Sequence, residues 1–144
     1  NEQLAVMLGV TPEEVAARIA DYEKRGVIKG YSVILNEELA DKNAVTAFIE
    51  VKVTPKADFG FDELARTIMM YDEVDSVTLM SGSFDLAVTL SGTNYKEIAL
   101  FVAKRLSSID GVISTSTHFV LKQYKEQGFF IENEAADERG FVSP

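Results

Sequence analysis

The stretch VDSVTLMSGSFDLAVTL, residues 74–90, has the pattern of a β-hairpin. Two runs rich in β-branched and apolar residues, Val74–Met80 and Asp85–Leu90, flank the short segment Ser81–Phe84. Runs of this composition favour strands, and a short connection that contains glycine favours antiparallel pairing. The sequence therefore predicts two paired strands in this region.

An amphipathic helix and then a further strand are expected on each side of the hairpin. Apolar residues recur at helical spacing on both sides, at Phe61, Leu64, Ala65 and Ile68 before the hairpin and at Tyr95, Ile98, Ala99, Val102 and Leu106 after it. Ala44–Val53 and Val112–Lys122 have the composition of strands. The resulting order β-α-β-β-α-β is that of a ferredoxin-like domain, an α+β fold with both helices on one face of an antiparallel sheet.

The other face of this sheet is expected to need a cover. Phe48 neighbours Ile49 and Phe119 neighbours Val120, so apolar side chains would point to both faces. An apolar face left in water would be unusually large for a monomer. We therefore expect self-association through this face, giving a dimeric α/β sandwich.

The N-terminal part has the pattern of two helices joined by a tight turn. Glu2–Leu8 reaches Gly9, and Thr11 and Pro12 then have the residue types of a helix N-cap and first helical position. Val15, Ile19 and Tyr22 form one apolar stripe, and Gly26 ends the second helix. The chain starts at Asn1 almost directly in helical sequence, so we expect that a helix upstream is missing from this helix-turn-helix.

The predicted domain boundaries follow from these elements. Residues 1–30 form the helix-turn-helix, and residues 31–43 hold the end of a strand expected over Val27–Leu35 and then a polar linker. Residues 44–125 form the ferredoxin-like domain, and residues 126–144 form an acidic C-terminal tail.

Composition places the chain among globular proteins with a strong acidic excess. The 144 residues carry a net charge of −9 and include no cysteine. Residues 1–30 hold five acids and four bases, a net charge of −1, so −8 belongs to residues 31–144. This distribution disfavours general electrostatic binding to nucleic acid. No stretch is long and apolar enough to cross a membrane, so the expected location is cytoplasmic.

Several motifs resemble the Lrp/AsnC, or leucine-responsive, family of transcription regulators. They are Leu8-Gly9-Val10-Thr11, Arg18-Ile19, Gly26–Tyr31, Gly82–Asp85 and the Gly111–Leu121 strand. The resemblance implies a regulator without a cofactor that binds double-stranded DNA and a small effector, an amino acid or a close derivative. It also implies a homodimer, with tetramers or octamers as further assemblies.

In the family, the second of these helices is the recognition helix, which enters the major groove. The resemblance assigns DNA binding to Thr11, Glu13, Ala17, Arg18, Lys24 and Arg25. Family members often have adjacent arginines and hydroxyl residues where this chain has Ala16, Ala17 and a single arginine. We therefore expect modest affinity for DNA, and a solvated, self-capping helix is the alternative interpretation of Glu13 and Glu14.

The turn at residues 82–85 lies where the family has a Gly-Asp-Tyr-Asp-like turn associated with amino-acid binding between subunits. The resemblance assigns effector binding to Gly82, Ser83, Asp85, Thr115 and Thr117. Asp85 would pair with an ammonium, and the Gly82 amide and Ser83 hydroxyl would donate to a carboxylate. Ser83 replaces an acid of the family pattern and Phe84 lacks a hydroxyl, so a plain hairpin turn is an equal alternative.

Enzymatic alternatives find little support in the sequence. His118 is the only histidine, no residues fix it in a catalytic set, and no metal-binding spacing or phosphate loop is present. Some proteins that resemble this family decarboxylate haem precursors, a reaction that calls for more basic and imidazole groups than this chain has. A sensor that has lost DNA binding is a third interpretation, favoured by Glu13, Glu14 and the acidic charge.

Overall fold

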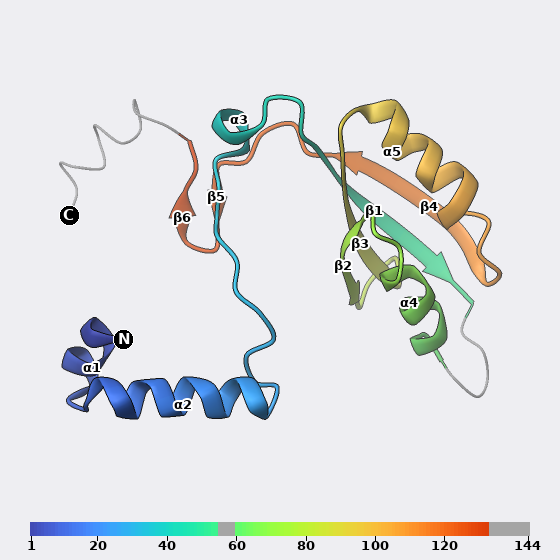
Figure 1. The fold of residues 1–144 in the computed structure, drawn as a ribbon. Coiled ribbons are helices and arrows are strands. Elements are labelled where there is room, and N and C mark those ends of the chain that lie inside the picture. Colours follow the sequence, from blue (N-terminus) through green and yellow to red (C-terminus); the bar gives the residue numbers. More distant parts are fainter. Residues whose placement is uncertain (55–59, 133–144) are drawn as a thin grey trace. The chain divides into compact units, whose positions relative to one another are not determined.

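A computed structural model describes residues 1–54 and 60–132 of the chain. The chain divides into two compact units, Asn1–Ile34 and the residues from Leu35 onward, shown in Figure 1. No helix in the described ranges is long and apolar enough to cross a membrane.

The first unit is a pair of helices whose ends agree with the predicted capping residues. Helix α1 spans Glu2–Leu8 and ends at Gly9, which has a left-handed φ of 68°. Helix α2 spans Pro12–Lys24, and the Oγ1 atom of Thr11 accepts a hydrogen bond from the Glu14 backbone N–H at 3.2 Å. Ala5 and Val15 are buried between the helices, so the predicted helix, turn and helix are confirmed.

The strand expected over residues 27–35 is not found. After α2, the backbone N–H groups of Val27 and Ile28 both donate to the carbonyl of Tyr22, at 2.8 and 3.1 Å. From there to residue 36 the chain has no regular structure. A strand needs a neighbouring strand to complete its backbone hydrogen bonds, and these residues pair with none in the part of the chain described. Strand-like composition alone was therefore a misleading indication here.

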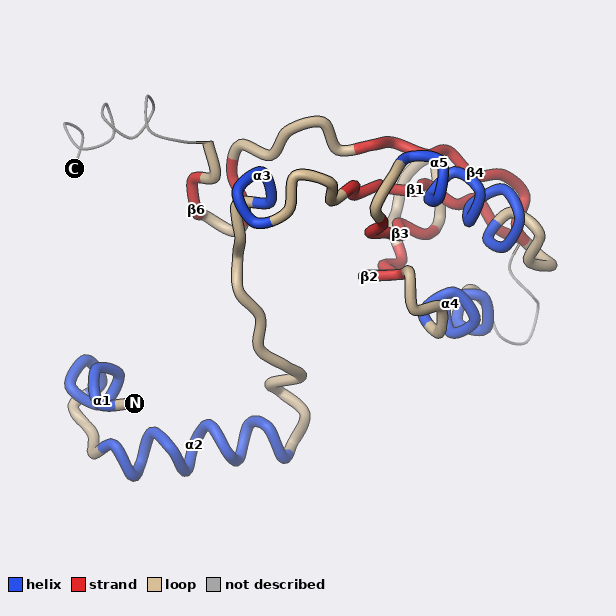
Figure 2. The backbone as a smooth tube through the Cα atoms, turned by 45° about the horizontal axis from the view of Figure 1, so that its top comes forward, coloured by secondary structure: helices blue, strands red, loops and turns tan. Residues whose placement is uncertain are grey.

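The second unit contains the predicted β-α-β-β-α-β order. Its elements are β1 (Val45–Val53), α4 (Asp62–Met69), β2 (Val74–Leu79), β3 (Leu86–Gly92), α5 (Tyr95–Phe101), η1 (Val102–Leu106) and β4 (Val112–Phe119). The strands form one antiparallel sheet in the order β2-β3-β1-β4, seen in Figures 1 and 2. The sequence predicted that the closing strand would extend to Lys122, but the strand ends at Phe119.

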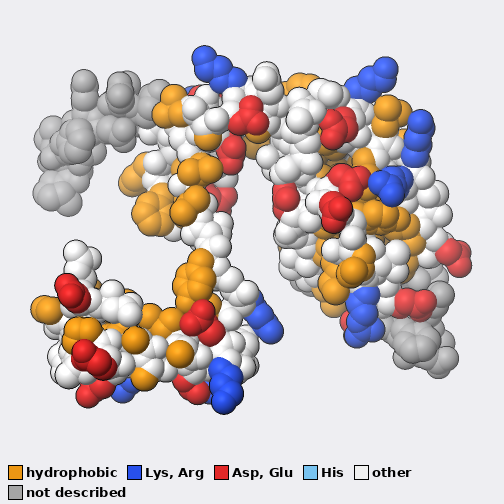
Figure 3. Space-filling view, in the orientation of Figure 1, with side chains coloured by type: hydrophobic (Ala, Val, Ile, Leu, Met, Phe, Trp, Pro, Cys, Tyr) orange, Lys and Arg blue, Asp and Glu red, His pale blue; other side chains and the backbone are white. Residues whose placement is uncertain are grey.

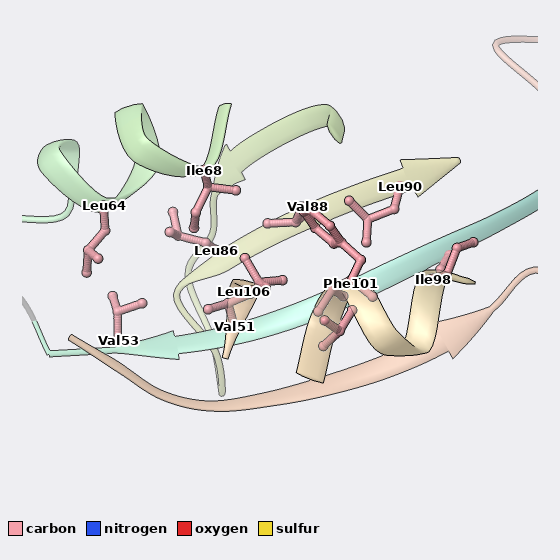
Figure 4. Close-up of a cluster of buried hydrophobic side chains, with 13 residues drawn as sticks. Val51, Val53, Leu64, Ile68, Leu86, Val88, Leu90, Ile98, Phe101 and Leu106 are labelled. Atoms are coloured by element: carbon pink, nitrogen blue, oxygen red, sulfur yellow. The ribbon is translucent and has the colours of Figure 1, made fainter. Parts of the chain in front are cut away.

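Both helices pack against the same face of this sheet. Figure 4 shows Leu64 and Ile68 of α4 and Ile98 and Phe101 of α5 pointing toward side chains of the central strands. Along β1 every second residue from Ala47 to Val53 is buried, as expected for a strand with one covered face. The core therefore lies between the helices and the sheet.

The opposite face of the sheet is more polar than the sequence predicted. The strand register places on it Thr46, Phe48, Glu50, Lys52, Ser76, Thr78, Ala87, Thr89, Ser91, Ser114, Ser116 and His118. Only Phe48 contributes a large apolar side chain, and its ring packs edge-on against Phe84 at 6.0 Å between centroids. Phe119 belongs instead to the residues packed on the core, and the exposed Val120 follows the last pair of β1 and β4. The expectation of a large apolar face was wrong, because most outward positions carry hydroxyl or charged groups.

The segments on either side of the sheet domain lie next to each other. Helix α3 (Glu37–Ala40) follows Asn36, whose Nδ2 donates to the carbonyl of Ile131 at 3.2 Å. Strands β5 (Lys125–Glu126) and β6 (Phe129–Phe130) form a small hairpin. The residues of the expected tail from 133 to 144 lie outside the described part of the chain.

Candidate functional site

Helix α2 presents the residues that the sequence assigned to DNA binding. Thr11, Glu13, Ala17, Arg18 and Lys24 are all exposed. At 3.6 residues per turn, Glu13, Ala17 and Lys24 fall in one line opposite the buried Val15. The helix therefore has a complete exposed face, and the Thr11 cap fixes where that face begins.

Arg25 is exposed, but it is held by contacts within the same unit. Its Nε donates to Asp21 Oδ2 at 2.9 Å, and its guanidinium lies 5.4 Å from the centre of the Tyr22 ring. Asp21 neutralises part of the positive charge that a phosphate would meet. Among the assigned basic residues, Arg18 and Lys24 have no ion-pair partner within the described residues.

The turn between β2 and β3 uses Asp85 as a structural residue. The Asp85 N–H donates to the carbonyl of Val51 at 3.0 Å, and its Oδ2 accepts from the Val53 N–H at 2.9 Å. The Asp85 carbonyl accepts from Met80 at 2.8 Å. Asp85 thus ties the turn to the end of β1, and the sequence did not reveal this role.

Gly82 and Ser83 form the exposed part of the same turn. Gly82 has a φ of 125°, a value that residues with a Cβ atom rarely adopt. Ser83 is exposed. The sharp turn therefore depends on glycine at this position and leaves the Ser83 hydroxyl accessible.

Thr115 and Thr117 lie on a different surface from the turn. They pair with Val51 and Ile49 of the neighbouring strand β1 and lie on the side of the sheet that the helices cover. The Thr115 hydroxyl lies 3.1 Å from the Ser107 hydroxyl, just after η1. Strand β1 separates β4 from β3, so one chain does not bring these threonines to the Gly82–Asp85 turn.

His118 lies on the uncovered face of the sheet. Its Nε2 is 3.2 Å from Glu50 Oε1, and its ring is 6.1 Å from that of Phe48. Within the described residues no cluster of three or more histidine, cysteine, aspartate or glutamate side chains suits a metal ion. The arrangement is that of a surface hydrogen-bonding residue.

The structure also contains a groove that sequence reasoning missed. It has a volume of about 260 Å³ and is lined by Glu73, Leu90, Ser91, Glu97, Ile98, Leu100, Phe101, Lys104 and Arg105. These residues come from the segment before β2, from β3 and from the α5–η1 helix. Only the folded chain brings these residues together. Glu73 and Arg105, for example, are 32 positions apart in the sequence and form an ion pair at 3.2 Å.

A second cavity of about 300 Å³ lies between the linker and the C-terminal hairpin segment. Lys122 Nζ donates to Glu132 Oε1 at 3.0 Å in its wall. This hydrogen bond, together with the charge of Glu132, raises the pKa of Lys122 above its ordinary value. The contact holds two parts of the C-terminal segment together.

Comparison with known proteins identifies the family. The Lrp/AsnC ligand binding domain matches residues 46–128, more than half of the chain. The chain belongs to the Lrp/AsnC family. An uncharacterized helix-turn-helix-type transcriptional regulator of Bacillus subtilis, YugG, is 45% identical over 99% of this chain and 87% of its own length. The leucine-responsive regulatory protein of Haemophilus influenzae is 29% identical over 91% of this chain and 78% of its own.

Solved structures of Lrp/AsnC proteins share the fold. The complex of a transcriptional regulator from Neisseria meningitidis with L-methionine matches with a TM-score of 0.68 and 25% identity, covering 87% of this chain and 80% of that one. Escherichia coli AsnC matches with a TM-score of 0.67 and 20% identity, covering 89% and 84%. The predicted α+β fold is confirmed. The prediction of a regulator rather than an enzyme is also confirmed, since the relatives are transcription regulators.

Proposed function

We propose that this Lrp/AsnC regulator binds double-stranded DNA through helix α2, associates with copies of itself and responds to an amino-acid effector. The observation that carries the DNA-binding part is the capped helix α2, whose side opposite Val15 is fully exposed. In helix-turn-helix proteins the N-terminal residues of such a helix contact base edges. Thr11, Glu13 and Ala17 would occupy these positions, with Arg18, Lys24 and Arg25 near phosphates.

Electrostatics in the first unit favours weak non-specific binding. Arg25 already pairs with Asp21, and Glu13 and Glu14 place negative charge at the start of the helix. Each phosphate contact contributes about 0.9 to the slope of log affinity against log salt, so few contacts give a shallow slope. Specific base contacts would then supply most of the preference for a target site.

The test is a gel-shift titration of the full protein against its own upstream DNA across a salt series. Arg18→Gln is expected to lower the slope by about 0.9, the value of one phosphate contact. Lys96→Gln, a matched loss of charge at an exposed position of α5, should leave it unchanged. Absence of binding even at low salt would refute the DNA-binding proposal, and the DNA-silent sensor would take its place.

The effector part of the proposal places an amino acid at the Gly82–Asp85 turn, with Thr115 and Thr117 supplied by a neighbouring subunit. It is supported by the exposed Ser83 and by the Neisseria meningitidis relative, which is described in complex with L-methionine. Because Asp85 already accepts the Val53 N–H, its second carboxylate oxygen would meet the effector ammonium.

Thermal-shift screening of the twenty amino acids tests this site, since a ligand that binds the folded state raises the melting temperature. Asp85→Asn is the sharpest variant because its amide oxygen still accepts from Val53 while the charge is lost. We expect it to abolish the response to the effector. A full response in Asp85→Asn would remove Asp85 from the site.

Self-association is proposed to use the uncovered face of the sheet. Phe48 and Phe84 form its apolar part, and Glu50 and His118 form a polar pair beside them. Light scattering at micromolar concentration tests the assembly, with Phe48→Ser as the weakened variant. A monomer of 15.9 kDa would contradict the proposal.

A further inference from the structure

The groove beside α5 has an apolar floor and a charged rim. Leu90, Ile98 and Phe101 line it and belong to the hydrophobic core, and Leu100 adds a half-exposed apolar side chain. In Figure 3, hydrophobic side chains reach the surface of the second unit with acidic and basic side chains beside them. The volume of about 260 Å³ lies below the roughly 300–1,000 Å³ of drug-sized sites, so it suits a small metabolite.

The helix that forms one wall changes its geometry at the groove. Helix α5 continues as the π-helix η1, where the Ser107 N–H donates to the Val102 carbonyl, five residues earlier, at 2.8 Å. Short π-helical turns within α-helices are rare and are frequent at functional sites. Lys104 and Arg105, two of the four charged residues of the groove, are carried by this turn.

Arg105 is fixed at the rim by three neighbours. Its guanidinium lies 5.1 Å from the centre of the Tyr71 ring and 5.8 Å from that of Phe101. Its Nη1 is 3.2 Å from Glu73 Oε2. A guanidinium held in this way loses little conformational freedom when it binds a carboxylate.

The charges of the groove balance. Glu73 and Glu97 provide two negative charges, and Lys104 and Arg105 provide two positive charges. Glu97 accepts a hydrogen bond from the Thr93 hydroxyl at 2.6 Å, and Lys104 has no ion-pair partner in the described residues. A wall with both signs and no net charge favours a ligand that also carries both signs.

We propose that this groove is a second ligand site, separate from the Gly82–Asp85 turn, and that it binds a small zwitterion with an apolar side chain. The ammonium and carboxylate of an α-amino acid are attached to the same carbon, so they need opposite charges close together. Glu73 and Arg105 supply these charges, with Glu73 accepting from the ammonium and Arg105 donating to the carboxylate. The side chain packs against Leu90, Ile98 and Phe101.

Isothermal titration calorimetry of the full chain with L-leucine tests the proposal. Two analogues separate the contributions of the charges, 4-methyl-2-oxopentanoate without the ammonium and 3-methylbutylamine without the carboxylate. We expect L-leucine to bind at least about tenfold more tightly than either analogue, because each analogue lacks the charge-assisted hydrogen bonds of one of its two charged groups.

Two variants locate the binding. Arg105→Met keeps an unbranched side chain and removes the carboxylate donor, and Glu73→Gln removes the charge that meets the ammonium. Each is expected to weaken binding by about tenfold or more. Arg66→Met is the matched control, since Arg66 forms an exposed ion pair with Asp62 on α4 and does not line the groove. Circular dichroism checks that each variant is folded.

The outcomes distinguish this site from the turn. Binding of L-leucine that is lost in Glu73→Gln and Arg105→Met but kept in Arg66→Met and Asp85→Asn supports the proposal. Binding lost only in Asp85→Asn overturns it and assigns the ligand to the turn. Absence of binding at millimolar concentration also overturns it, as does equally tight binding of the oxo acid, and neither result bears on DNA binding.

Discussion

Replacing Asp85 tests how the central hairpin is attached to β1. The ladder between β1 and β3 ends at Val51 and Leu86, so the Val53 N–H lies beyond the last strand pair. The Asp85 carboxylate takes the place of a strand carbonyl there and accepts this N–H at 2.9 Å. Val53 is only 4% exposed, so its N–H would have little access to water if the carboxylate were removed.

The size of the effect follows from this burial. A hydrogen bond to a charged group contributes about 1.5–3 kcal/mol to stability, and an unsatisfied buried donor costs a similar amount. We therefore expect Asp85→Ala to lower the free energy of unfolding by about 1.5–3 kcal/mol. Asp85→Asn keeps a neutral acceptor and should cost about 1 kcal/mol.

Urea denaturation monitored by circular dichroism measures these differences. The control is Asp72→Ala, which removes an exposed carboxylate in another turn of the same unit and should change stability by less than about 0.5 kcal/mol. A value for Asp85→Ala within about 0.5 kcal/mol of the wild type, at an unchanged m-value, would refute the argument.

Three further predictions concern the rest of the chain. Thr11→Ala removes the cap of α2 and should reduce the helical signal of the first unit at a cost of about 1 kcal/mol, measured by thermal melting. Ile68→Ala should cost about 2–5 kcal/mol in urea denaturation because the side chain is fully buried, whereas Met69→Ala on the exposed side of α4 should cost little. Because its folded pKa is raised, Lys122 stabilises its contact with Glu132 fully below the ordinary value of 10.5 and loses it as pH rises through the higher folded value. A ¹³C NMR titration of Lys122 should show this shift, and Glu132→Gln should bring the pKa back toward 10.5.

The local elements could be predicted because their determinants are local. Thr11 and Pro12 mark the start of α2, and the φ of 75° at Gly26 accompanies its end. In the second unit, the periodicity of apolar residues gave the order of helices and strands. The same method placed the end of β4 three residues too late, since apolar residues continue past Phe119 after the pairing with β1 has ended.

Features that depend on partners distant in the sequence were missed. Residues 27–35 have the composition of a strand, but composition does not say whether another strand lies beside them. The negative charge of Asp85 suggested that it would bind the ammonium of an effector. Its hydrogen bond from the Val53 N–H depends on the position of β1, which the sequence does not give. The groove is lined by residues far apart in the sequence, among them Glu73 and Arg105, which pair only in the folded chain.

The polar character of the uncovered sheet face changes the expected energetics of self-association. An apolar face would drive association through buried area alone, about 25 cal/mol per Å². Hydroxyl and charged groups such as Ser116, Glu50 and His118 contribute only when each finds a partner, because an unsatisfied buried polar group costs about 1–3 kcal/mol. Association through this face would therefore depend on matched hydrogen bonds around the Phe48 and Phe84 rings. A substitution such as Thr46→Val on this face, which replaces a hydroxyl by a methyl group of similar size, should then weaken the assembly, whereas area-driven association would tolerate or favour it.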